Sequence, residues 1–363
     1  MSAAVVQNNI VFIVDDRGIE ACSRIVDALG ARCLHIDGVA ETSLQGDDLV
    51  AVDVDLTDIA NVRRLRSVLR HRKPPAFQAF AVNHLRRLEM VYASIVGATA
   101  ILRRPFMLTD LTDRLTRHLT EDRDPAGGRA YGEEASAPSI EAAAGALGQM
   151  FDAIASEESF DAGCVESAGM EVIDAISGIG FPGWVETVRR HHESTFQHCL
   201  IVTGVATTFG CGTGMSRKDI LTLTTAGLLH DIGKAGIPVA ILDKPGKLTG
   251  EELDAIKRHP DLGHDYLAAS QSLEPEVLGA VRFHHEYLDG SGYPLGLSGK
   301  DIGDVTRILT VCDVYGALIE RRAYKAPMSA AGAFQVLDGM AAAGKLEACL
   351  VHALQTSILS QQR

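Results

Sequence analysis

The chain has 363 residues, of which 46% are hydrophobic, so it is long enough for two ordinary domains with packed cores, and a disordered chain is excluded. The net charge of −13 disfavours broad binding of nucleic-acid polymers, although local cations or metal ions can still create a pocket for a small anion. Seven scattered cysteines without a CxxC pair indicate reduced thiols, and the lack of a leader or a long apolar run predicts a cytoplasmic protein without membrane insertion.

The first third of the chain alternates short apolar runs with helical patterns. Residues 10–14, 49–52 and 100–102 are predicted strands, and residues 19–29 form a predicted helix. This alternation predicts an α/β domain with a parallel sheet over residues 1–118. The following segment is rich in Asp, Gly, Ala, Ser and Pro, which is typical of a linker, here placed at residues 119–139.

The remaining residues, 140–363, lack strand patterns and show helical periodicity, so we expect an all-α domain that begins with accessory helices. Two helix starts are marked by capping residues. Ser216 with Asp219 is expected to cap a helix that leads to His230, and Thr249 with Glu252 forms a capping box for a helix that ends near His259.

Histidine and aspartate side chains of this second domain form a candidate metal site. Imidazoles and carboxylates suit divalent ions such as Fe, Mn, Ni or Zn, and seven such groups are enough for two ions. If His230 and Asp231 lie on one helix, they point about 100° apart, so that the carboxylate can bridge two ions while the imidazole binds one. The candidate ligands are His198, His230, Asp231, His259, His284, His285 and Asp313.

Each of these residues, taken alone, is more often an ordinary surface or core residue than a metal ligand. Two sequence contexts favour ligation. His230 and Asp231 follow the apolar residues 226–229, and Asp313 interrupts the apolar run 308–312. An unpaired charge is costly to bury in such surroundings, so these carboxylates require a metal ion or another cation.

Several motifs resemble the signature of the HD-GYP family over about residues 195–325. They are His230-Asp231-Ile232-Gly233-Lys234, Ile237-Pro238, Lys244 to Thr249, His284-His285-Glu286 and Asp289 to Pro294. The resemblance implies an all-α domain with a bimetal or trimetal centre that hydrolyses cyclic di-GMP to linear pGpG, to GMP, or to both. It also implies that the seven candidates are the metal ligands. Family members with three ions carry a glutamate where this chain has Ser194, so we predict two ions, with Fe or Mn ahead of Ni, Zn or Mg.

By the same resemblance, Asp231 and Lys234 are the candidate catalytic residues. Lys234 and Tyr293, together with Arg322 and Lys325, are the candidate substrate-binding residues. The chain departs from the family pattern at two positions: Gly316 replaces a second aspartate and Ala323 replaces a proline. These changes leave open the hydrolysis of another cyclic nucleotide. A separate alternative is a non-catalytic cyclic di-GMP receptor or regulatory interaction protein.

The first domain resembles a response-regulator receiver, and this resemblance implies a flavodoxin-like order of its parallel strands. Its acidic pair is Asp15 and Asp16, and the candidate phosphoacceptor is Asp53. Arg104 replaces the family's lysine, and Val82 stands at the switch position, where a hydroxyl would normally respond to the phosphoryl group. We therefore expect a degenerate receiver that serves docking or dimerisation, with a sensor kinase or another signalling protein as a partner and a homodimer as one arrangement.

Overall fold

The computed structural model describes residues 9–46, 48–70, 72, 76–83, 86–120, 137–155, 162–191, 194–242, 244, 246–269, 273–320 and 327–361. Contacts divide the chain into two compact units, Met1–Gly128 and Arg129–Arg363. Of the predicted linker, only the edges are described, and they are helical: α4 (Leu108–Thr120) ends at Thr120 and α5 (Ala137–Ala155) begins at Ala137.

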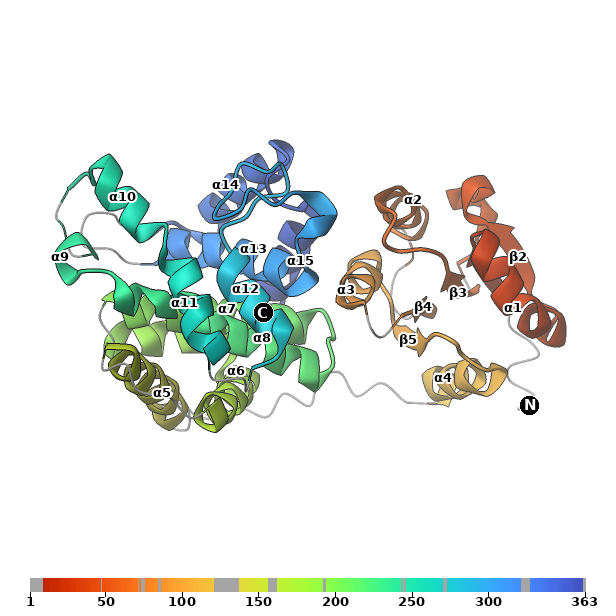
Figure 1. The fold of residues 1–363 in the computed structure, drawn as a ribbon. Coiled ribbons are helices and arrows are strands. Elements are labelled where there is room, and N and C mark those ends of the chain that lie inside the picture. Colours follow the sequence, from red (N-terminus) through yellow and green to blue (C-terminus); the bar gives the residue numbers. More distant parts are fainter. Residues whose placement is uncertain are drawn as a thin grey trace. The chain divides into compact units, whose positions relative to one another are not determined.

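The N-terminal unit contains the predicted parallel sheet (Figure 1). Its strands are β1 (Ile10–Val14), β2 (Arg32–His35), β3 (Leu49–Asp53), β4 (Gln78–Val82) and β5 (Ala100–Arg103). They pair in parallel in the order β2-β1-β3-β4-β5, which is the flavodoxin-like order. Every residue of β1, β3 and β4 is buried, as expected of a parallel sheet covered on both faces.

Helices follow these strands as the alternating pattern predicted. They are α1 (Asp16–Leu29), α2 (Ile59–Leu69), α3 (Arg87–Val96) and α4, with short 3-10 turns at η1 (Ile36–Gly38) and η2 (Glu41–Ser43). The core of this unit lies between sheet and helices and includes Phe12, Ala79 and Leu111. The carboxyl ends of β1 and β3 meet at Val14 and Asp53, which are register partners.

Within the described residues of the C-terminal unit, the regular elements are all helices, and the β-contact there is an isolated bridge between Asp289 and Ser298. After α5 come α6 (Ala162–His191), α7 (Ser194–Gly212), α8 (Arg217–Leu229), η4 (Ile232–Gly236), α9 (Val239–Leu242), α10 (Gly250–Ile256) and α11 (His259–Ala269). The last elements are α12 (Pro275–Phe283), η5 (Gly299–Asp301), α13 (Asp304–Ile319), α14 (Ala330–Ala342) and α15 (Ala348–Ser360).

Both predicted helix caps are confirmed. The Ser216 side chain accepts from the Asp219 N–H at the start of α8, and Thr249 and Glu252 form the capping box of α10. The predicted end of the second helix is wrong by three residues, because α10 stops at Ile256 and His259 begins α11. Pro260 is tolerated in the first turn of α11, where its missing N–H needs no helical partner.

Helix α7 is central to the C-terminal unit and contacts α6, α8, α13 and α15. It is buried on all sides from residue 197 to 210, which is typical of a core helix. Small residues allow its neighbours to approach closely: a Cβ on Gly204 would lie 2.3 Å from the Trp184 ring, and a Cβ on Gly227 of α8 would lie 3.0 Å from the Cα of Thr203. The first contact brings α6 against α7, and the second brings α8 against α7. Within the described part of the chain, no helix is both long and apolar enough to span a bilayer.

Candidate metal centre

Five separate parts of the C-terminal unit bring the seven predicted ligands together. His198 lies within α7, His230 and Asp231 join α8 to η4, His259 begins α11, His284 and His285 follow α12, and Asp313 lies within α13. Their ligand atoms form two groups, and within each group these atoms lie within 4.8 Å of one another. One group is Asp231, His259, His284 and His285, and the other is His198, His230 and Asp313. All are buried except His285, whose side chain is 24% exposed.

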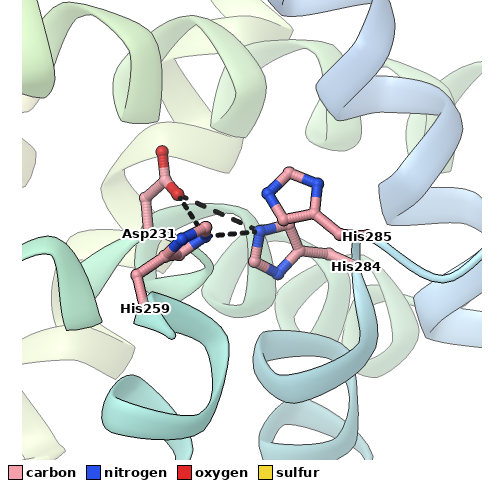
Figure 2. Close-up of side chains that lie close together, drawn as sticks. All are labelled: Asp231, His259, His284 and His285. Atoms are coloured by element: carbon pink, nitrogen blue, oxygen red, sulfur yellow. Dashed lines mark hydrogen bonds and ion pairs between the residues drawn. The ribbon is translucent and has the colours of Figure 1, made fainter. Parts of the chain in front are cut away.

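Asp231 lies between the two groups. Its Oδ1 is 3.1 Å from His259 Nε2, while its Oδ2 is 3.4 Å from His230 Nε2 and 3.6 Å from His198 Nε2. Figure 2 shows Asp231, His259 and His284 pointing toward one another, with His285 beside His284. The carboxylate therefore presents one oxygen to each group, which is the orientation that a bridging ligand requires.

The expectation that His230 and Asp231 share one helix is wrong. Helix α8 ends at Leu229, and Asp231 precedes the 3-10 turn η4 with φ −101° and ψ 7°. The carboxylate is therefore directed by the chain as it leaves the helix. Gly233 fixes this exit, because a Cβ there would lie 2.0 Å from the carbonyl oxygen of His259. Only glycine allows η4 to pack so closely against α11.

Three of the imidazoles are anchored in the same way. In His230, His259 and His284, Nδ1 lies 2.7–2.8 Å from the carbonyl oxygen of the residue three positions earlier. A carbonyl only accepts hydrogen bonds, so Nδ1 carries the proton and the Nε2 lone pair faces the cluster. His259 Nε2 and His284 Nε2 are 3.3 Å apart, as are His198 Nε2 and His230 Nε2. Such convergent nitrogen donors fit a divalent transition-metal ion.

The electrostatics keep four of these groups, Asp231, Asp313, His284 and His285, in their metal-binding forms. Burial alone would raise the pKa of Asp231, but the ammonium of Lys234 and the imidazole of His230 outweigh it and hold that pKa well below its usual range. The pKa of Asp313 is also lowered, because the hydrogen bond from His198 outweighs burial. Burial, with neighbouring imidazoles, lowers the pKa of His284 well below its usual range and that of His285 to about 4. Ionised carboxylates and neutral imidazoles are the forms that bind metal ions.

Two of the predicted substrate-binding residues lie beside the cluster. Lys234 Nζ is 2.5 Å from Asp231 Oδ2, and the Lys234 side chain is 24% exposed. The Tyr293 ring centroid is 4.7 Å from that of His285, and Lys257 Nζ lies 5.7 Å from the Tyr293 centroid. Arg322 and Lys325 lie outside the described residues.

The loop that carries Tyr293 is held by its backbone. Buried Glu286 accepts hydrogen bonds from Leu295 N at 2.6 Å and Leu297 N at 3.0 Å. A Cβ on Gly292 would lie 2.5 Å from the carbonyl oxygen of His285, so the loop passes directly over the histidine pair. The sequence motif contains Glu286, but this loop-anchoring contact was not predicted.

Two further residues of the C-terminal unit, His264 and Glu320, carry side chains that could bind a metal ion or support a ligand. His264 is not one of the seven candidate ligands, and it pairs with Asp265 at 3.0 Å outside the two groups. Glu320 was missed, although its buried Oε2 lies 3.4 Å from His198 Nδ1. Its signal is the position seven residues after Asp313, two helical turns along the same face.

In the N-terminal unit, the candidate phosphoacceptor Asp53 is already paired. Its Oδ1 accepts from Arg104 Nε at 2.7 Å, and its Oδ2 accepts from the Cys22 thiol at 3.1 Å. Arg104 also contacts buried Glu89 at 3.2 Å and donates to the Val54 carbonyl at 2.6 Å. Cys22 and Glu89 were not anticipated, because nothing in their local sequence connects them with residue 53.

The two aspartates of the predicted acidic pair have different surroundings. The Asp15 side chain caps α1 by accepting from Gly18 N at 2.8 Å, and its second oxygen accepts from Asp55 N at 2.7 Å. The Asp16 side chain is 98% exposed and lies 3.3 Å from His35. Asp15 therefore stabilises the backbone, whereas Asp16 points to solvent.

In a comparison with known protein families, residues 184–348 of this chain match the HD domain. That range contains all seven residues of the cluster.

Three relatives are enzymes by name. The chain is 46% identical over 114 residues to the cyclic di-GMP phosphodiesterase response regulator RpfG of Xanthomonas campestris, covering 31% of this chain and 30% of the relative. It is 37% identical over 143 residues to the cyclic di-GMP phosphodiesterase PA4108 of Pseudomonas aeruginosa, covering 39% and 34%. It is 40% identical over 126 residues to the 3'3'-cGAMP-specific phosphodiesterase 3 of Vibrio cholerae, covering 34% and 27%. The chain thus spans about a third of the length of each.

Proposed function

We propose that the C-terminal unit is a metal-dependent phosphodiesterase of the HD-GYP type that hydrolyses cyclic di-GMP to linear pGpG, to GMP, or to both. The observation that carries this proposal is the convergence of seven histidine and aspartate side chains around Asp231. The names of the relatives from Xanthomonas and Pseudomonas support cyclic di-GMP as the substrate.

Each group of ligands would hold one divalent ion, with Asp231 shared between them. Fe or Mn suits this mixture of imidazole and carboxylate, and Ni, Zn or Mg are alternatives. When bound, the pair of ions would activate water and neutralise charge on the scissile phosphate. No side-chain nucleophile is then required.

The chain's own residues would position the substrate. The Lys234 ammonium, held at the edge of the cluster by Asp231, is placed to bind a phosphate oxygen or to protonate the leaving 3′-oxygen. Tyr293 would line the substrate cleft beside His285, and Arg322 and Lys325 would supply further cationic contacts. Lys234→Ala separates the two roles of Lys234, because loss of a proton donor lowers kcat whereas loss of a phosphate contact alone raises KM.

A second candidate is hydrolysis of another cyclic dinucleotide. It is favoured by the similarity to a 3'3'-cGAMP-specific phosphodiesterase and by Gly316, which differs from the family pattern. A Cβ on Gly316 would lie 2.7 Å from Val202, so the close contact of α13 with α7 leaves no room for an aspartate there. A third candidate is a non-catalytic receptor for cyclic di-GMP.

One experiment separates the three candidates. The purified chain, loaded with Mn²⁺ or Fe²⁺, is incubated with cyclic di-GMP and with 3'3'-cGAMP, and products and binding are measured in parallel. We expect linear product from cyclic di-GMP. Product from 3'3'-cGAMP alone would favour the second candidate, and tight binding without turnover would favour the receptor.

For the N-terminal unit, we propose a degenerate receiver that docks a sensor kinase or another signalling protein, or a second copy of the chain. Support comes from the flavodoxin-like strand order and from the pairing of Asp53 with Arg104. A cytoplasmic location is part of the same proposal, since all seven cysteines are free thiols.

A further inference from the structure

His198 differs from the other buried histidines in the surroundings of Nδ1, the ring nitrogen that does not face the cluster. His230, His259 and His284 each use a backbone carbonyl three residues earlier. His198 Nδ1 is buried and makes no hydrogen bond of good geometry within the described residues. Its Nε2, by contrast, faces the cluster, 3.0 Å from Asp313 Oδ1.

The position of His198 in its helix explains this difference. His230 and His284 follow the last residues of α8 and α12, and His259 follows the end of α10, so carbonyl groups there are free of intrahelical partners. His198 lies inside α7, where the preceding carbonyls bond to N–H groups four residues further on. An acceptor for His198 must therefore come from another helix.

Glu320 places a carboxylate beside His198 Nδ1. It follows the last residue of α13, is 6% exposed, and its Oε2 lies 3.4 Å from His198 Nδ1. Arg189 Nη2 donates to the Ile319 carbonyl at 2.7 Å and so fixes the end of α13. One turn before Glu320, Gly316 packs against Val202, which is one turn after His198. The close approach at Gly316 thus brings the Glu320 carboxylate up to the imidazole.

We propose that Glu320 is a positioning residue that holds the Nδ1 proton of His198, so that Nε2 is presented to the metal ion of the His198, His230 and Asp313 group. A carboxylate behind an imidazole fixes its tautomer and ring orientation and raises its basicity as a ligand. This inference rests on the proposed metal centre and adds to it a residue on which metal affinity depends.

The test uses two substitutions of similar size in the full chain. Glu320→Gln keeps an oxygen that can accept a hydrogen bond from the Nδ1–H group of His198, whereas Glu320→Met fills the same space without an acceptor. Titration of the metal-free protein with Mn²⁺ by calorimetry gives the affinity and number of ions. We expect Glu320→Met to weaken one of the two ions about 10–100-fold and Glu320→Gln to stay within a few-fold of the unsubstituted chain.

Glu347→Gln is the matched control. Glu347 is another carboxylate of this unit, and it pairs with Arg307 at 3.2 Å. It should leave Mn²⁺ binding unchanged. If Glu320→Met binds Mn²⁺ as tightly as the unsubstituted chain, or if the Gln and Met variants weaken binding equally, the inference is overturned. Failure of the unsubstituted chain to bind Mn²⁺ would instead contradict the metal centre itself.

Discussion

The carboxylate of Asp53 and the guanidinium of Arg104 are joined by a hydrogen bond of 2.7 Å at the end of strand β3. The second oxygen of Asp53 accepts from Cys22, and Arg104 is further held by Glu89 and by the Val54 carbonyl. A partly buried ion pair with this many hydrogen bonds is costly to break. The flavodoxin-like sheet thus carries a candidate phosphoacceptor that is already paired with a cation.

We predict that a small phosphodonor such as acetyl phosphate, with Mg²⁺, leaves Asp53 unmodified. Both oxygens of the carboxylate are engaged, and Val82 offers no hydroxyl to stabilise the phosphorylated form. Intact-mass spectrometry of the treated chain measures this directly, with Asp53→Asn as the control. A phosphoryl adduct that disappears in Asp53→Asn would contradict the prediction.

Asp231→Asn should remove the bridge between the two ligand groups. An amide carries no charge and presents only one oxygen, so we expect fewer bound ions and turnover lower by at least about 100-fold. Metal analysis and product formation are measured on the same preparation. Asp265→Asn is the control, because that carboxylate is 76% exposed and lies outside the cluster. Equal metal content in both variants would show that Asp231 does not bridge.

The affinity for metal should rise with pH. Burial lowers the pKa of His198, but the nearby carboxylates of Asp313 and Glu320 outweigh burial and raise it to about 9 in the metal-free protein. The imidazole must then lose a proton before Nε2 can bind an ion, and this cost shrinks as pH approaches 9. We expect Mn²⁺ affinity to increase by up to about tenfold per pH unit below that value.

His285, whose pKa is lowered to about 4, is already neutral across this range and adds no further dependence. Calorimetric titrations in buffers of different ionisation enthalpy count the protons released per ion. If the affinity for Mn²⁺ is constant from neutral to mildly alkaline pH and no proton is released, metal binding is not coupled to deprotonation of His198.

Gly233→Ala should disturb the cluster without removing any ligand. The added methyl would meet the carbonyl oxygen of His259 and push η4 away from α11, separating Asp231 from His259. We expect a loss of about 1–3 kcal/mol in stability together with weaker metal binding. Gly279→Ala in α12 is the control, since nothing lies within 4 Å of a Cβ there. Thermal unfolding with and without Mn²⁺ compares the Gly233→Ala and Gly279→Ala variants. Equal unfolding temperatures in both conditions would mean that the close contact of Gly233 with His259 does not position Asp231.

The sequence was sufficient for features that depend on local pattern. Buried runs such as Ile10–Val14 predicted the parallel strands, and polar residues set in apolar helices, such as Asp313, predicted the cluster. It was insufficient where geometry depends on long-range packing. The exit of Asp231 from α8 is fixed by His259 through Gly233, and Glu320 meets His198 only because α13 crosses α7 at Gly316.

The number of metal ions per chain, measured by elemental analysis after anaerobic reconstitution with Fe²⁺ or Mn²⁺, tests the central claim most directly. Seven ligands in two groups around one shared carboxylate predict two ions in the unsubstituted chain. A chain that retains no transition metal, while remaining folded, would contradict the account.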